Sequence, residues 1–138
     1  MASDFIKWRD EFSVGLEEID NQHKELINMI NELYTSFMNK EHNSKIEEIV
    51  QRMTDYTVMH FSTEEKYFTA YNYVDSKEHI EQHKAFVEKV ADFKSKLENR
   101  TATLTFKIIS FLQEWLLNHI LKEDTKYKPM LKEAGLVK

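Results

Sequence analysis

The sequence contains no cysteine, a single proline at Pro129, and only two glycines, Gly15 and Gly135. Without thiols the chain cannot form disulfides, thiolate zinc sites, iron–sulfur clusters or a cysteine nucleophile, so any metal chemistry rests on His, Asp and Glu. The scarcity of glycine and proline disfavours a turn-rich sheet, and the abundant Glu, Lys, Leu and Ile favour long helices. The composition therefore predicts an all-α protein.

Long hydrophobic runs are also missing. No apolar stretch approaches the roughly 20 residues of a membrane span, and the N-terminal MASDFIKWRDEF lacks the apolar core of a signal peptide. The 19 basic and 24 acidic residues give a net charge of −5 that is spread along the chain, which disfavours nucleic acid as a partner. We expect a cytoplasmic protein that binds neither membrane nor nucleic acid, and the 138 residues predict one domain over 1–138.

Four stretches carry apolar residues at the spacing of one helix face. They predict helices over about 19–38, 44–69, 76–98 and 103–122, with an N-terminal arm over 1–18 and a C-terminal tail or short helix over 124–138. Links of about six residues cannot cross the length of a bundle, so neighbouring helices should be antiparallel. The predicted architecture is an up-down-up-down antiparallel four-helix bundle with the arm packed across it.

The pattern also predicts local features of these helices. Asp20 is a candidate cap for the first helix, and Asp75 with Glu78 can form a capping box for the third. Four methionines at helical spacing are interpreted as adaptable core residues rather than metal ligands: Met29, Met38, Met53 and Met59.

Polar residues with metal-binding chemistry interrupt all four apolar faces. They are His23 on the first helix, His60 and Glu64 on the second, His79 and His83 on the third, His119 on the fourth, and Asp124 beyond it. The pairs four residues apart lie one turn apart on the same face and can bind one metal site. Asp124 is five residues from His119, so on an ideal helix it points elsewhere and reaches the site only from a bent or frayed helix end.

A single histidine on an apolar face is more often a core residue with one hydrogen bond than a ligand. Five buried imidazoles and two carboxylates are different, because each unpaired group would cost several kcal/mol, and a shared cation removes that cost. His42, in the polar link between the first two helices, has no such neighbours and is expected at the surface.

The number and type of donors restrict the metal. Imidazole with carboxylate suits iron, zinc or manganese, and seven donors exceed the four of a structural zinc site, so we expect two ions bridged by the carboxylates. If each ion takes six ligands and one solvent oxygen also bridges, five imidazoles leave one position vacant. A small diatomic ligand fits such a vacancy.

Four motifs resemble the hemerythrin family, and specifically the single-domain bacterial hemerythrins: IDNQH at 19–23, HFSTEE at 60–65, HIEQH at 79–83 and HILKED at 119–124. The resemblance runs from Trp8 to about Tyr127. It implies two iron ions per chain with an oxo or hydroxo bridge, and dioxygen as their ligand. It also implies that His79, His83 and His119 bind the saturated iron, that His23 and His60 bind the iron with the vacancy, and that Glu64 and Asp124 bridge.

The resemblance implies an apolar oxygen pocket lined by Leu26, Phe61, Trp115, Leu116 and Ile120, although these are equally ordinary core residues. Ligating imidazoles usually donate their second nitrogen to a nearby acceptor. The candidates for that role are Glu17, Gln22, Glu65, Gln82 and Glu123.

The function implied by the resemblance is reversible dioxygen binding for storage, transport or delivery, without enzymatic activity. The expected partners are dioxygen and, for delivery, an oxygen-consuming enzyme. The alternatives are a di-iron oxidase or peroxidase, an oxygen or iron sensor, an iron store, and a purely structural bundle. Oxygen-activating bundles usually present four carboxylates and two histidines in Glu-x-x-His pairs, whereas this chain offers five histidines and two carboxylates without such a pair.

Overall fold

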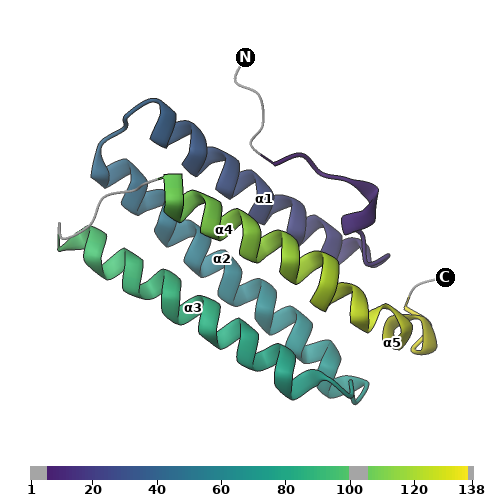
Figure 1. Ribbon diagram of the computed structural model, residues 1–138. Coiled ribbons are helices and arrows are strands. Elements are labelled where there is room, and N and C mark those ends of the chain that lie inside the picture. The colour runs from purple at the N-terminus through teal and green to yellow at the C-terminus, as the bar shows by residue number, and fades with distance from the viewer. Residues whose placement is uncertain (1–5, 100–105, 137–138) are drawn as a thin grey trace.

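The computed structural model describes residues 6–99 and 106–136, and within these ranges the regular structure is entirely helical (Figure 1). The four long helices are α1 (Glu17–Met38), α2 (Asn43–Ala70), α3 (Ser76–Glu98) and α4 (Phe106–Asn118). Figure 1 shows consecutive helices running in opposite directions, and α1 packs on α2 and α4 while α2 packs on α3. The predicted all-α, four-helix bundle is confirmed. Positions 103–105 of the predicted fourth helix lie outside the described residues.

Apolar side chains fill the end of the bundle at which the chain passes from α1 to α2. Each long helix contributes a side chain with at most 1% of its surface exposed: Leu33 from α1, Ile49 from α2, Leu97 from α3 and Ile109 from α4. Each such burial stabilises the fold by roughly 1.5–3 kcal/mol. This apolar half anchors the helices whose opposite ends carry the predicted ligands.

Two of the long helices, together with the short C-terminal helix α5 (Lys128–Glu133), end with a residue in the left-handed conformation. The residues are Lys40 (φ 54°) after α1, Asn72 (φ 53°) after α2 and Gly135 (φ 77°) after α5. In each case the next residue donates its backbone N–H to a carbonyl five residues back, as Tyr73 does to Phe68 at 3.0 Å. These bonds satisfy carbonyl groups that the end of a helix leaves free.

The N-terminal arm packs along α1. The backbone N–H and carbonyl of Ile6 both bond to the side-chain amide of Asn31, at 2.7 and 2.8 Å, and Phe12 is buried. The predicted cap at Asp20 is wrong, because α1 begins at Glu17 and is preceded by Leu16. The Asp20 carboxylate instead accepts hydrogen bonds from the Ser13 hydroxyl and the Val14 N–H, so it ties the arm to the helix.

The predicted capping box of α3 is also wrong. Asp75 precedes α3, but its side chain makes no capping hydrogen bond, since its backbone (φ −95°, ψ 18°) is not extended. Among the methionines, Met29 and Met53 are buried as predicted, whereas Met38 and Met59 are 58% and 42% exposed. The prediction that Met38 and Met59 are core residues is therefore wrong, because both lie at the edge of the apolar face, where solvent reaches them.

The C-terminal region leaves the bundle in three short elements. After α4 come the π-helical turn η2 (His119–Glu123), the 3₁₀ turn η3 (Asp124–Tyr127) and then α5, with Pro129 in its first turn. Pro129 is tolerated there because the first N–H groups of a helix need no partner within it. None of the helices in the described ranges combines the length and apolarity that a bilayer crossing demands.

Candidate metal centre

All seven predicted donors lie in the half of the bundle nearest α5: on the N-terminal parts of α1 and α3, on the C-terminal part of α2, and in the turns η2 and η3 that follow α4. Figure 1 shows these parts of the helices side by side. Their exposed fractions do not exceed 3%, and they are His23, His60, Glu64, His79, His83, His119 and Asp124. His42, in contrast, is exposed immediately before α2. The structure therefore gathers every residue of the predicted set and leaves the sixth histidine outside.

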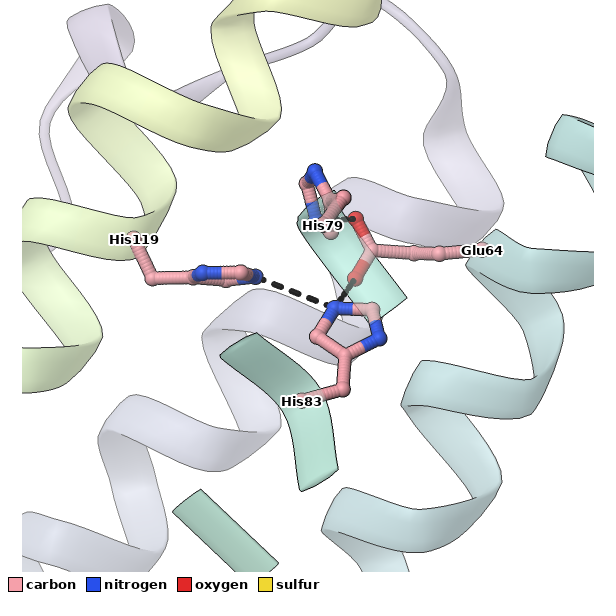
Figure 2. Close-up of side chains that lie close together, drawn as sticks. All are labelled: Glu64, His79, His83 and His119. Carbon is pink, nitrogen blue, oxygen red and sulfur yellow. Dashed lines mark hydrogen bonds and ion pairs between the residues drawn. The ribbon is translucent and has the colours of Figure 1, made fainter. Parts of the chain in front are cut away.

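The first group of donors consists of Glu64, His79, His83 and His119, whose ligand atoms all lie within 4.8 Å of one another. Figure 2 shows their side chains converging from α2, α3 and the end of α4. The Nε2 atoms of His83 and His119 are 3.1 Å apart, and His83 Nε2 lies 3.3 Å from Glu64 Oε1. Asp124 Oδ1 joins this group at 2.9 Å from His79 Nε2 and 3.1 Å from His119 Nε2.

The second group consists of His23, His60, Glu64 and Asp124, again with ligand atoms within 4.8 Å of one another. Asp124 Oδ2 is 2.9 Å from His23 Nε2, and Glu64 Oε1 is 3.1 Å from His60 Nε2. Glu64 belongs to both groups, and Asp124 directs one oxygen at each. Both carboxylates thus lie between three imidazoles on one side and two on the other.

The geometry of these contacts fits metal ligation better than hydrogen bonding. A metal–nitrogen bond of about 2.1 Å separates two ligands at right angles by about 3 Å, which matches the distances above. Within the described chain, both oxygens of Asp124 and the Nε2 atoms of His60 and His79 make no hydrogen bond despite these short contacts. Buried polar atoms that lie this close without a hydrogen bond of good geometry are stabilised by a shared cation.

The π-helical turn explains how Asp124 reaches the centre. A π-helix pairs residues five apart, so η2 turns His119 and Asp124 towards the same side, which an α-helix would not do. The sequence predicted that Asp124 reaches the site from a bent or frayed helix end, and the structure shows a π-helical turn in that place. Such widened turns occur frequently at functional sites.

Burial and neighbouring charges shift the ionisation of several groups. Burial lowers the pKa of His60, only partly offset by Glu64, so this imidazole favours the neutral form that binds metals. Burial alone would raise the pKa of Asp124, but His119, His23 and His79 outweigh it and hold that pKa well below its usual range. The pKa of Glu64 is likewise lowered, because His60 and His83 outweigh its burial and the repulsion from Asp124. Neutral imidazoles and ionised carboxylates are the forms that coordinate a cation.

Three polar side chains outside the donor set hold it in place. The Gln22 amide oxygen lies 2.7 Å from His60 Nδ1, and Glu65 Oε2 lies 3.2 Å from His83 Nδ1. These two are the sequence candidates that the structure selects; Glu17 and Gln82 make no such bond within the described ranges, and the Glu123 side chain lies outside the description. The third is Tyr127, whose buried hydroxyl donates to Glu64 Oε2 at 2.6 Å.

Sequence reasoning missed Tyr127 as a site residue. Burial, and next the charges of Glu64 and Asp124, raise the pKa of Tyr127 well above its usual value, so its hydroxyl remains a donor. The signal in the sequence was the spacing of Tyr127 and Leu131, which are four residues apart just after the last motif. The structure shows both side chains completely buried. That spacing indicates a short helical face turned towards the site.

Aromatic rings cover the centre on the side facing the apolar half. Phe61 is stacked on His83 with ring centroids 3.7 Å apart and planes at 4°, and Trp115 is stacked on His119 at 4.5 Å and 13°. The Trp115 ring is in turn stacked on Phe86 at 3.9 Å. These contacts fix the orientations of two imidazoles and exclude water from them.

A small cavity of about 10 Å³ lies beside this aromatic cover, roughly the room that one molecule of water size needs. Its walls are almost wholly apolar, and they comprise Leu26, Ile30, Met53, Thr57, Phe61, Phe86, Trp115 and Leu116. Four residues of the predicted oxygen pocket are among them. Ile120 is completely buried but does not line the cavity.

The profile of the Hemerythrin HHE cation binding domain matches residues 14–131, which span all seven donors and Tyr127. The chain belongs to the hemerythrin family. The resemblance on which the sequence motifs were interpreted is thus confirmed.

Individual hemerythrin relatives cover most of the chain. It is 32% identical to a bacteriohemerythrin of Pseudomonas aeruginosa over 88% of its length and 78% of the relative's. It is 36% identical to a hemerythrin-like protein of Naegleria gruberi, over 91% and 93% respectively. Among solved structures, wild-type hemerythrin superposes with a TM-score of 0.87 at 31% identity, over 92% of this chain and 98% of that one.

Proposed function

We propose that this hemerythrin-family chain holds two iron ions and binds dioxygen reversibly, for storage, transport or delivery of the gas. In this proposal it does not turn over a substrate. The observation that carries the proposal is the pair of donor groups that share Glu64, one with three imidazoles and the other with two. In this proposal His79, His83 and His119 would hold one ion, His23 and His60 would hold the other, and the two ions would share Glu64 and Asp124. The iron pair supplies the reversible electron transfer on which dioxygen binding depends.

The position of the vacancy follows from the donor count. With both carboxylates shared, the side with His23 and His60 has one protein ligand fewer than the side with three imidazoles. The small cavity has walls on both sides of the centre. Leu26 and Ile30 follow His23 along α1 and Met53 and Thr57 precede His60 along α2, while Phe86 and Trp115 line it from the side of His83 and His119. An ion held by His23 and His60 would therefore have its vacant position within reach of this cavity. We therefore assign the oxygen site to this cavity and the ion beside it.

The surrounding side chains serve this function by keeping the site dry and rigid. The Thr57 hydroxyl donates to the Met53 carbonyl at 2.6 Å, which leaves the cavity without a free donor from that residue. An apolar cavity disfavours water and anions, whose hydrogen bonds would be lost there. Gln22, Glu65 and Tyr127 hold the imidazoles and the shared carboxylate in position.

The experiment is metal analysis together with optical spectra over repeated cycles of oxygen and argon. Two irons per chain and an absorption band that appears with oxygen and disappears under argon are expected. His60→Ala should lose oxygen binding and part of the iron, whereas His42→Ala, at an exposed position, should change neither. Irreversible oxidation with steady turnover of a reductant would instead indicate an oxidase, and a fold that takes up no iron would indicate a structural bundle.

A further inference from the structure

Two cavities in the described part of the bundle share one side chain, that of Met53. The inner one is the small apolar cavity beside the metal centre. The outer one is a groove of about 380 Å³ between α3 and α4, and its lining includes Val90 and Leu112 of the apolar core. Met53, with 2% of its surface exposed, is the only residue that lines both.

The walls of the two cavities continue into each other. On α3, Phe86 lines the inner cavity and Val90, one turn later, lines the groove. On α4, Leu112 lines the groove and Leu116, one turn later, lines the inner cavity. The Met53 side chain therefore lies where the surface groove and the inner cavity meet.

The rim of the groove is charged, but its charges are engaged. Lys96 Nζ lies 3.1 Å from Asp92 Oδ2, and Lys89 Nζ lies 4.8 Å from the centre of the Phe111 ring. Behind this rim the lining is apolar, with Val90, Ile108 and Leu112. A neutral diatomic gas crosses such a surface at little cost, whereas water and anions lose hydrogen bonds.

A second groove, of about 330 Å³, lies between α2 and α3 and reaches the His83 imidazole itself, and Phe61 separates it from the inner cavity. That ring is held on several sides, since it is stacked on His83, meets Phe86 edge-on and packs against Trp115. Any movement of Phe61 breaks these contacts at once. Met53 carries an unbranched thioether with three rotatable bonds, which changes rotamer within a packed core more easily than a stacked ring.

We propose that dioxygen reaches the metal centre through the groove between α3 and α4, and that Met53 is the gate between the groove and the inner cavity. The inference rests on the proposed function, which makes dioxygen the ligand. The gate opens by rotation of the thioether side chain while the helices stay in place. It admits small apolar molecules and closes behind them.

The test compares two tryptophan substitutions at half-buried aliphatic residues, Ile108→Trp in the α3–α4 groove and Val87→Trp in the α2–α3 groove. Stopped-flow measurement on the iron-loaded protein gives the dioxygen association rate. Ile108→Trp should slow it by about tenfold, because the indole raises the barrier along the route. Val87→Trp should leave it unchanged. The opposite result would show that the gas enters past Phe61, and equal rates in both variants would overturn the route altogether.

A second pair of variants tests the gate itself. Met53→Ala should speed both association and release of dioxygen, whereas Met29→Ala, which removes a buried methionine that lines neither cavity, should not. Xenon exchange, followed by xenon NMR on the same proteins, should respond to the four substitutions in the same order. Because xenon needs no iron chemistry, this measurement still decides the route if the protein proves not to bind dioxygen. If neither Met53→Ala nor Ile108→Trp changes the rate of xenon exchange, Met53 is not a gate on the route to the inner cavity.

Discussion

The two halves of the bundle are equally buried but are built from opposite kinds of side chain. In the half around Leu33, Ile49 and Leu97, burial removes apolar surface from water and stabilises the fold at every position. In the half around Glu64 and Asp124, burial removes charged and polar groups from water and costs free energy until a cation compensates. The apolar half therefore maintains the helices, and their rigidity holds together ligands in the other half that would otherwise repel one another or face water.

Of the substitutions that separate the two halves, Glu64→Ala is expected to have the largest effect, and the effect is on iron binding. Glu64 is the residue common to both donor groups, so its loss should remove binding of both ions, with iron affinity falling by more than about 100-fold. Metal content per chain after dialysis against a weak chelator measures the effect. Glu48→Ala, at an exposed position of the same helix, is the control and should retain both irons. Full iron loading of the Glu64 variant would refute the bridging role.

In the apolar half, Leu97→Ala should destabilise the protein by about 2–5 kcal/mol, because it leaves a cavity in a completely buried position. Iron stoichiometry should remain at the wild-type value, since Leu97 lies at the opposite end of α3 from His79 and His83. Denaturant unfolding and metal analysis of the same sample check both statements. Loss of iron with little loss of stability would show that the two halves are not separable.

A smaller effect is expected from Tyr127→Phe, which removes the hydrogen bond to Glu64 without changing the ring. A bond to a charged acceptor contributes about 1.5–3 kcal/mol, and loss of such support usually weakens metal binding by roughly tenfold or more. Competition with a chelator measures the iron affinity. Tyr67→Phe is the matched control, because its hydroxyl bonds to Glu18 at the surface. Equal affinities in the two variants would remove Tyr127 from the site.

The smallest effect concerns pH. In the metal-free protein the pKa of His60 lies below its ordinary 6.5, so between these values the unfolded chain binds a proton that the folded chain does not. This residue's contribution to stability must therefore fall as pH drops below about 6.5. The lowered pKa values of Glu64 and Asp124 add losses in the same direction at lower pH.

Unfolding curves of the metal-free protein at several pH values check this prediction. The free energy of unfolding lost in Leu97→Ala should be the same at each pH, because the Leu97 side chain is completely buried and does not titrate. A metal-free protein that is more stable at pH 5.5 than at pH 7 would contradict the assignment of neutral His60 to the folded state.

Much of the fold and the site could be predicted from periodicity. The apolar stripes place His60 and Glu64, and likewise His79 and His83, one turn apart, so their convergence follows once the stretches are helices that pack. The same reasoning kept His42 outside, and the structure places it at the surface. Side chains whose direction depends only on their own helix were predictable.

Predictions failed where a side chain had a choice of partners. Asp20 looks like a cap, yet it bonds Ser13 and Val14 because the arm folds back on α1. Asp75 has the right neighbour in Glu78 but not the backbone conformation that capping needs. Met38 and Met59 share the spacing of core residues and lie at the margin of the face, where solvent reaches them.

The sequence by itself determined the class of the protein, since thiol chemistry is excluded and seven nitrogen and oxygen donors recur on four amphipathic stretches. Only the tertiary structure decided which groups support them: Gln22 on His60, Glu65 on His83 and Tyr127 on Glu64. It also decided the π-helical turn that aligns Asp124 with His119, and the position of Met53 in the walls of both cavities. The physical reason is that periodicity fixes directions within one helix, whereas these features depend on distances between helices that only packing sets.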